Sequence, residues 1–598
     1  MKRWALTALF VVLTGCAAAP PPEPPPPPPP PAAPTADQNF AALTGRYLDE
    51  FPQLAPVAAT QLGDHRYDAA LDDVDTNAQN ARLAFAERYL RELAEIPRAA
   101  LSRANQVDAA LLENQLRYDI WQVQTLEEWR WNPLIYTSLA GNAIYSLLAR
   151  DFAPLPERLV HTGARLDALP RFLEQVRSVL VPERVPRVHA ETAIRQNSGL
   201  TTLIDSVVVP RLAELPAEQR AGLEASIDTA RNAIEQHQLW LERLLLPQAK
   251  GDFRLGAELY DAKLAFALAS PLTREQIRDR AMRELTGTRA EMYGIARVVL
   301  ADRKRAPSTP VAPTERQQQR AIEAALELAY ADQPARDEVF EVARRSYTET
   351  EHFVKTKDLV SVFNDPLEII PMPEFQRGVA LAYCDPPGPL DTGLKTFYAV
   401  SPIPENWSRQ QVRSFLREYN TRSIHNLTVH EAMPGHYLQL MHANRYESPL
   451  RAVLASGPFI EGWAVYAERL MVDQGYYDND PLMRLVQLKW YLRSIGNALL
   501  DQAVHVDGMK REAAMRLMMR DTFQEEREAA AKWVRVQLSS AQLPTYFVGA
   551  QEHFALRAEA EQRAGADFDL KQYHDKLLSF GSPPVRYARA LMFDLPIE

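Results

Sequence analysis

The stretch 270-SPLTREQIRDRAMRELTGTRAEMYGIARVVL-300 indicates the fold class. Thr273 and Gln276 have the spacing of a capping box, in which two side chains satisfy free backbone N–H groups where a helix begins. Apolar side chains then recur every three or four residues, the period of one helix face, at Ile277, Ala281, Met282, Leu285, Met292 and Ile295. The stretch therefore predicts a long amphipathic helix that begins after Thr273.

Most of the chain after about residue 36 has the same character. Ala, Leu, Glu, Arg and Gln are abundant, and only 23 of the 598 residues are glycine, a composition that favours helices. Ser408 and Gln411 form another capping-box pattern at the start of 408-SRQQVRSFLREYN-420. The sequence therefore predicts a mainly α protein, with one large helical body over residues 37–598.

The region from about residue 365 to 407 departs from this pattern, because Pro, Gly and β-forming residues are common there. The segment 394-LKTFYAV-400 has the features of a strand between turns. We therefore expect a small sheet next to the segment that follows it. Such a strand could bind an extended peptide by strand addition, with Tyr398 as a candidate substrate-binding residue. A purely structural edge strand is the alternative.

The first residues, MKRWALTALFVVLTGC, have basic side chains at Lys2 and Arg3, a short apolar stretch, and then Cys16. The apolar stretch is too short to span a bilayer, so it indicates a secretory signal. Its ending resembles a bacterial lipoprotein signal, which implies cleavage after residue 15 and lipid attachment to Cys16. A plain signal peptide is the alternative. Ala17 follows the cysteine, and by the usual sorting pattern this favours the outer membrane, with the protein facing the periplasm.

Residues 16–36 are almost entirely Pro and Ala after the cysteine, which predicts an extended spacer between the lipid and the body. The formal net charge of −10 and the absence of a basic block argue against a nucleic-acid partner. Cys384 is the other cysteine, so a lipidated Cys16 leaves no pair for an intrachain disulfide. We expect membrane association through the lipid anchor only, and the oligomeric state stays open.

The segment 428-TVHEAMPGHYLQL-440 contains the elements of a metal site. A zinc hydrolase needs imidazole or carboxylate ligands, an open position for water, and a base; His430 and Glu431 offer a ligand and a base. On a regular helix, His436 would lie about 120° around and about 9 Å along from His430, too far for one ion. Pro434 and Gly435 permit a two-residue excursion that would return His436 to the same face. Alternatively, they end one helix and His436 caps the next.

Downstream, 459-FIEGWAVYAERLMV-472 offers two acidic residues on one predicted helix face, Glu461 and Glu468. They lie about 10 Å apart along a helix, so both cannot bind one ion. Glu461 follows His436 by 25 positions, which leaves room for a helix, a turn and a second helix. We favour Glu461 because Gly462 allows close approach. An exposed Glu without a metal role is the alternative.

The segments 429-VHEAMPGHYLQ-439 and 461-EGWAVYAE-468 together resemble the bacterial domain-of-unknown-function family 885, whose members are taken to be relatives of the gluzincin peptidases. Residues 40 to about 590 are compatible with that family. The resemblance implies one zinc ion per chain, held by His430, His436 and Glu461, with Glu431 as general base. It also implies a helical body with a central cleft, as in angiotensin-converting enzyme and thimet oligopeptidase. Dipeptidyl peptidase III is similar in its enlarged His-to-His spacing.

Two later stretches offer groups for catalysis. In 489-KWYLRSIGNALLDQAVHVDG-508, polar residues recur at every fourth position, from Lys489 through Arg493, Asn497 and Asp501 to His505. This ladder predicts either a polar cleft or a solvated face. Asp501 could orient His505 as a catalytic or substrate-binding imidazole.

The stretch 535-RVQLSSAQLPTYFVG-549 contains Arg535 and Tyr546, and family 885 has a similar pattern there. In related gluzincins a late Tyr donates to the oxyanion, which implies this role for Tyr546; a packed aromatic is the alternative. Arg535 could pair with a substrate carboxylate. The sequence thus predicts an envelope zinc peptidase acting on oligopeptides. The alternatives are another metal-dependent amide or ester hydrolase, or an inactive peptide-binding protein, which the intact Glu431 disfavours.

Overall fold

The computed structural model describes residue 1 and residues 34–304, 306–373 and 382–597. The predicted signal peptide, Cys16 and nearly all of the proline-rich spacer lie outside these residues. Within the described ranges, no helix has both the length and the apolar character needed to cross a membrane.

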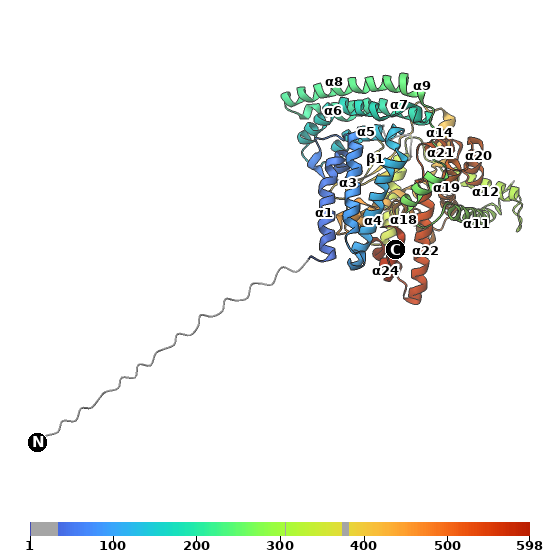
Figure 1. Ribbon diagram of the computed structural model, residues 1–598. Helices are drawn as coiled ribbons and strands as arrows, with labels where there is room; N and C mark the ends of the chain where they lie inside the picture. The colour runs from blue at the N-terminus through green and yellow to red at the C-terminus, as the bar shows by residue number, and fades with distance from the viewer. Residues whose placement is uncertain (2–33, 305, 374–381, 598) are drawn as a thin grey trace.

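Helices make up the chain before the sheet. They are α1 (Ala36–Leu54), α2 (Pro56–Leu62), α3 (Thr76–Ala94), α4 (Arg103–Trp121), α5 (Leu134–Leu148), α6 (Leu155–Val179), α7 (Arg187–Leu203), α8 (Ala217–Trp240), α9 (Leu246–Gln248), α10 (Gly256–Leu268), α11 (Arg274–Leu300), α12 (Glu315–Tyr330) and α13 (Val339–Thr356). The helices α6, α7 and α8 form a layer across one end of the molecule, and α1, α3 and α4 lie side by side below it (Figure 1).

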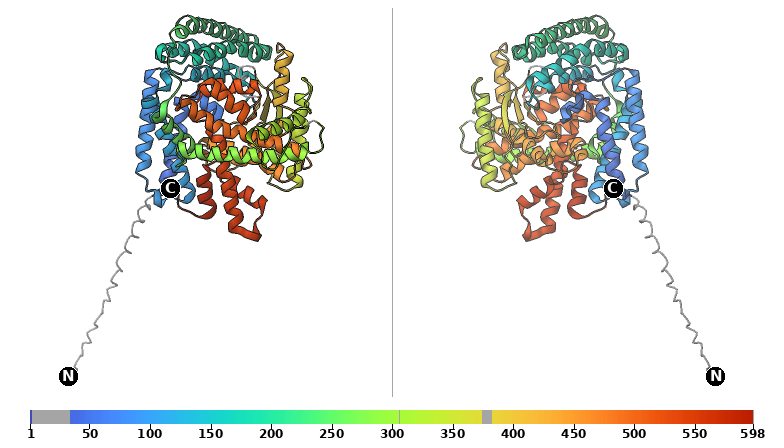
Figure 2. Two further views of the ribbon diagram at one scale, coloured as in Figure 1. Left: turned by 90° about the vertical axis from the view of Figure 1, so that its right-hand side faces the viewer. Right: turned by 90° about the vertical axis from the view of Figure 1, so that its left-hand side faces the viewer.

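A second set of helices follows the sheet and contains the candidate site. It consists of α14 (Arg409–Glu418), α15 (Thr421–Glu431), α16 (His436–Ala443), α17 (Pro449–Val453), α18 (Gly457–Asp473), α19 (Pro481–His505), α20 (Arg511–Arg516), α21 (Glu526–Leu538), α22 (Pro544–Ala564), α23 (Leu570–Leu578) and α24 (Val585–Phe593). The far end of α22 projects from the body at the end opposite to α8 (Figure 2). The prediction of a mainly α protein is confirmed.

The capping boxes predicted from the sequence are both present. Thr273 accepts a hydrogen bond from the Gln276 backbone N–H while the Gln276 side chain accepts one from Thr273, and α11 begins at Arg274. Ser408 and Gln411 cap α14 in the same way. Of the apolar residues predicted to face the core from α11, Met282 does not, since it is 49% exposed. It follows buried Ala281 by about 100° of helix rotation, which carries it off the buried face.

The predicted sheet is present and has three strands, β1 (Leu367–Pro371), β2 (Ala382–Asp385) and β3 (Thr396–Val400). The strand order is β1-β3-β2, with β3 parallel to β1 and antiparallel to β2. Because β3 is paired on both sides, it has no free edge. The predictions of peptide addition to this strand, and of a structural edge strand, are therefore both wrong.

Tyr398, on β3, lies inside the protein. Its side chain is fully buried, and its hydroxyl is 3.3 Å from the Thr428 Oγ1 on α15. Tyr398 therefore joins the sheet to the helix that carries His430, and it has no exposed surface through which to contact a peptide.

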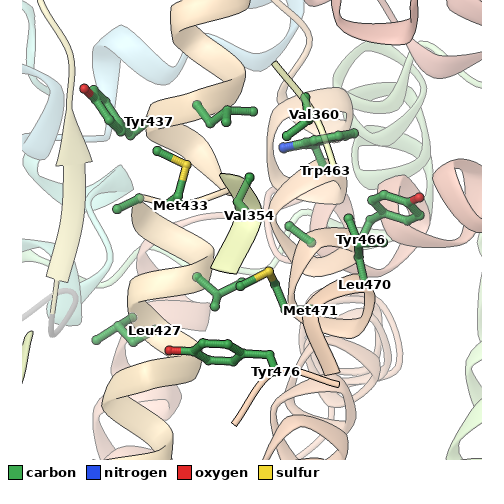
Figure 3. Packing of buried hydrophobic residues seen from close by; sticks show 14 of the residues in the cluster. Val354, Val360, Leu427, Met433, Tyr437, Trp463, Tyr466, Leu470, Met471 and Tyr476 are labelled. Carbon is green, nitrogen blue, oxygen red and sulfur yellow. The ribbon is translucent and has the colours of Figure 1, made fainter. Parts of the chain in front are cut away.

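The largest part of the core surrounds α15, α16 and α18. Buried side chains from these helices and from α13 fill the space between them, among them Leu427, Trp463 and Met471, and Met433 from the loop between α15 and α16 packs with them (Figure 3). Every residue of α15 from Ser423 to Glu431 is buried. Polar side chains on such a helix need partners inside the protein, so their contacts reveal how the site is built.

Candidate metal centre

The two extra residues between the histidines are displaced from the helical path. The first helix, α15, ends at Glu431, and α16 begins at His436. The Leu438 N–H donates to the Ala432 carbonyl oxygen at 3.2 Å, a bond across six residues where a regular helix spans four. A new helix does begin at His436, as one alternative predicted, and the two-residue excursion predicted by the other is also present.

Gly435 and Pro434 have specific packing roles in this excursion. A Cβ atom on Gly435 would lie 1.9 Å from the His430 carbonyl oxygen, so only glycine allows the chain to pass so close to α15. The Trp463 indole N–H on α18 donates to the Pro434 carbonyl at 2.8 Å. The loop is thereby anchored to the helix that carries Glu461.

His430, His436 and Glu461 converge and form a group that could hold a metal ion. The Glu461 Oε2 atom is 3.7 Å from His430 Nε2 and 3.4 Å from His436 Nε2. Two ligands about 2.1 Å from one ion, at a tetrahedral angle, lie about 3.4 Å apart. Glu461 Oε2 is buried and accepts no hydrogen bond from any other described residue. The three donor atoms therefore fit a single cation between them.

Glu468 orients the first imidazole. Its Oε1 is 2.7 Å from His430 Nδ1, which leaves Nε2 directed at Glu461, and its Oε2 accepts from the Asn426 side chain at 2.8 Å. A carboxylate on the far nitrogen of a ligating histidine holds the ring in place and increases its basicity. Glu461 thus belongs to the metal group, and Glu468, two helical turns further along α18, contacts the other nitrogen of His430.

The electrostatics of the group favour a positive charge at its centre. Burial alone disfavours imidazolium, but Glu461 and Glu468 together raise the pKa of His430 to about 10. Burial likewise opposes the charged form of Glu461, yet His430 and His436 hold the pKa of its carboxyl well below the usual range. A metal ion would replace the proton in this arrangement, since a ligating histidine must be neutral.

We expect Glu468→Gln to weaken metal binding about 10- to 100-fold, the usual effect of losing such a second carboxylate. The amide removes the negative charge opposite His430 Nδ1 while keeping the size of the side chain. Competition titration with a chromophoric chelator measures the change. Glu559→Gln, on an exposed pair with Arg589, is the matched control and should leave the affinity unaltered.

Glu431 faces a small cavity beside the metal group. Its Oε2 accepts a hydrogen bond from the Cys384 backbone N–H on β2 at 2.9 Å. Burial, opposed by the nearby imidazoles, raises the pKa of Glu431. The cavity has a volume of about 110 Å³, and its lining also includes His430, Tyr546 and Arg535.

Tyr546 and Arg535 reach this cavity from two further helices. The Tyr546 ring stacks near His430, with ring centres 6.4 Å apart, and its hydroxyl is 3.4 Å from Arg535 Nη2. The helix α22 can approach because Gly462 and Gly549 meet: a Cβ on Gly462 would lie 2.3 Å from the Gly549 carbonyl carbon. The structure therefore brings Tyr546 and Arg535 close to four other predicted site residues, His430, Glu431, His436 and Glu461.

Only part of the polar ladder on α19 reaches the site. Arg493 and Asn497 line the cavity. His505 does not line it; instead its Nε2 lies 2.8 Å from the Val536 carbonyl oxygen. Each step of four residues turns about 40° and rises about 6 Å, so His505 lies about 12 Å beyond Asn497. The solvated-face alternative fails as well, because Lys489, Asn497, Asp501 and His505 are buried.

The predicted pairing of Asp501 with His505 is also loose. Asp501 Oδ1 is 4.0 Å from His505 Nε2, while its Oδ2 accepts hydrogen bonds at 2.8 Å from the Tyr260 hydroxyl and the Ala541 N–H. This carboxylate therefore holds α10 and the turn before α22 in place. A role for His505 in catalysis finds no geometric support.

Sequence reasoning missed Lys532, which lines the cavity from α21. No local pattern around Lys532 distinguishes it from other charged residues of a helix. The contact of Glu468 with His430 could have been expected, because Glu468 lies seven residues after Glu461 on the same helix face. Asn426 could have been expected near His430 for a similar reason, since it precedes His430 by one helical turn.

Two solved structures with lipoprotein descriptions, and one family model, are similar to this chain. A comparison with curated proteins yields no match. A solved structure described as "a putative lipoprotein of unknown function from Shewanella oneidensis" is 32% identical, with a TM-score of 0.77, and the match covers 94% of this chain and 100% of that one. A "putative lipoprotein from Colwellia psychrerythraea" has a TM-score of 0.77 at 17% identity, covering 94% and 99%, and shows the shared fold alone.

The family model described as "Bacterial protein of unknown function (DUF885)" matches residues 56–592. This match includes the sheet, the displaced loop, all three residues of the metal group and the helices that line the cavity. The chain belongs to this family.

Proposed function

We propose that the protein is a zinc-dependent peptidase that hydrolyses oligopeptides. The observation that carries the proposal is the convergence of His430, His436 and Glu461 beside a cavity into which Glu431 faces. Two imidazoles and one carboxylate are the protein ligands of a well-known class of catalytic zinc site. Pure peptide binding would need no carboxylate base next to such a group.

A bound zinc ion supplies Lewis-acid polarisation of a carbonyl and lowers the pKa of water at its open position. The chain supplies the proton transfers. Glu431 accepts the proton of the attacking water and delivers it to the leaving amine. Burial raises the pKa of Glu431, and a base with a raised pKa holds the transferred proton more strongly. The Cys384 N–H keeps one carboxylate oxygen in a fixed direction.

Tyr546 and Arg535 would stabilise the developing oxyanion or hold the substrate. The Tyr546 hydroxyl is a donor near His430, and the Arg535 guanidinium on α21 lies within hydrogen-bonding distance of that hydroxyl. Donors that are positioned in advance, in a site with little water, are strong stabilisers of transition-state charge. Burial raises the pKa of Tyr546, so the phenol keeps its proton for donation.

We propose a gluzincin-like architecture with the site in a central cleft, which would admit short or unfolded peptides. A lipid anchor at Cys16 would attach the protein to the outer membrane, facing the periplasm. Descriptions of the Shewanella and Colwellia proteins as lipoproteins support the anchor. The net charge of −10 is consistent with a peptide substrate in place of a nucleic acid.

Removal and return of the metal test the function. We expect the full-length protein in detergent to cleave a mixed peptide library, to lose this activity on dialysis against a chelator, and to regain it with about one equivalent of zinc per chain. Mass spectrometry identifies the cleaved bonds. Cleavage that continues unchanged in the metal-free protein would exclude the mechanism. Hydrolysis of esters or non-peptide amides alone would favour the other hydrolase class.

A further inference from the structure

Three basic side chains line the cavity that His430 and Glu431 also line. They are Arg493 from α19, and Lys532 and Arg535 from α21. The carboxylates that line the same cavity, Glu431 and Glu468, already have hydrogen-bond partners among the described residues. We call the three basic residues the basic wall of this cavity.

Two of the three residues of the basic wall lie close to carboxylates. Arg493 forms an ion pair with Glu528, and the Lys532 ammonium is 4.0 Å from that same carboxylate. Lys532 donates to the neutral Asn497 side chain at 2.8 Å. Burial, followed by the charge of Arg493, lowers the pKa of Lys532 well below its usual value. Arg493 also lies 3.8 Å from Glu418 Oε1, so Arg493 and Lys532 both have a carboxylate close by.

Arg535 has no carboxylate partner among the described residues. Its Nη2 donates to the Gln542 side chain at 3.1 Å and approaches the Tyr546 hydroxyl at 3.4 Å, and both partners are neutral. Arg535 is partly buried, and a guanidinium removed from water is normally paired with a carboxylate, because burying a charge is costly. Its fork of N–H groups matches a carboxylate in particular. An anion brought by the substrate would complete the pairing of Arg535.

We propose that Arg535, with Lys532 and Arg493 beside it, binds the carboxyl terminus of the peptide substrate, so that the enzyme removes residues from carboxyl ends. This inference deepens the proposed function and depends on it for the cleavage step. The basic wall and Glu431 line one cavity of only about 110 Å³. Because one extended residue spans about 3.5 Å, a carboxylate bound in so small a cavity would stand one or two residues from the bond that is cleaved.

Binding to an inactive variant tests the site without catalysis. In zinc-loaded, full-length Glu431→Gln, calorimetry should show that an N-acetylated tripeptide acid binds about 100-fold more tightly than its C-terminal amide, as expected for a buried charged hydrogen bond. Adding Arg535→Gln should reduce this ratio to about threefold or less. Arg535→Lys should keep part of the preference, because it retains the charge but not the fork.

Controls separate a binding role from a structural one. Arg589→Gln, at an exposed pair, should leave the acid-to-amide ratio unchanged. Zinc content of each Arg535 variant reports whether the site is still folded. A tripeptide amide with a C-terminal Asp distinguishes a side-chain carboxylate from the terminal one, and we expect it to bind as weakly as the plain amide.

The outcomes have separate meanings. Equal binding of acid and amide would overturn the carboxylate site, and tight binding of the Asp amide would overturn the carboxyl-terminal source. In the wild type, products shortened by one or two residues from the carboxyl end would support the inference, and internal cleavage of amidated peptides at the same rate would overturn it. A carboxylate preference without any hydrolysis would reject the peptidase function and still support the binding site.

Discussion

Replacing Glu431 with Gln should lower kcat/KM for a peptide substrate about 10³-fold, within the range attributed to general acid–base catalysis. The amide has nearly the size of the carboxylate but cannot accept the proton of the attacking water. Glu431 is not one of the three converging ligands, and its Oε2 already accepts a hydrogen bond from the Cys384 N–H. Zinc binding should therefore be unchanged in this variant.

The measurement combines steady-state kinetics with metal analysis of the same preparation. Glu552→Gln is the matched control, because Glu552 is another carboxyl whose pKa burial raises, to about 7, at a distance from the metal group. Its variant should keep wild-type activity. If Glu431→Gln kept the wild-type rate, another group would be the base. If the variant lost its zinc, Glu431 would be a ligand.

Removing the second imidazole should have a similarly large effect on metal affinity. Structural zinc sites gain on the order of 10–16 kcal/mol from four ligands, so each ligand contributes about 2.5–4 kcal/mol. Since every 1.4 kcal/mol is a factor of about ten, His436→Ala should weaken zinc binding roughly 10²- to 10³-fold. Peptidase activity at limiting zinc should fall in parallel.

His442→Ala is the matched control for this experiment. His442 lies on the same helix, six residues after His436, but its Nε2 is 2.8 Å from the Ser361 carbonyl oxygen and faces away from the metal group. We expect the His442→Ala variant to bind zinc as tightly as the wild type, measured by competition with a chromophoric chelator. Zinc bound with native affinity by His436→Ala would mean that the displaced loop does not deliver a ligand.

Local features of this fold were predictable from the sequence because they depend on neighbouring residues. The capping boxes at Thr273 and Ser408 need only the spacing of two side chains, and both are present. The strand at 396–400 follows from residue type and the surrounding turns. Its central position in the sheet could not be predicted, because it depends on which earlier segments pair with it, β1 on one side and β2 on the other.

The metal group was partly predictable. Pro434 and Gly435 indicated a possible excursion, and helix geometry excluded Glu461 and Glu468 as joint ligands. The structure brings Glu461 to the two imidazoles and Glu468 behind the first one. The residues alone could not distinguish the excursion from a simple helix end, because that depends on how α16 packs after the break.

By itself, the sequence determined the helical class, the sheet next to the helix that carries His430, and the residue types needed for a metal site. These features follow from residue propensity, from hydrophobic periodicity and from short spacings between residues in the chain. Only the tertiary structure decided which side chains share one cavity. Arg493, Lys532, Arg535 and Tyr546 come from α19, α21 and α22. Their approach depends on contacts such as Gly462 against Gly549, between segments whose separation along the chain carries no information about distance in space.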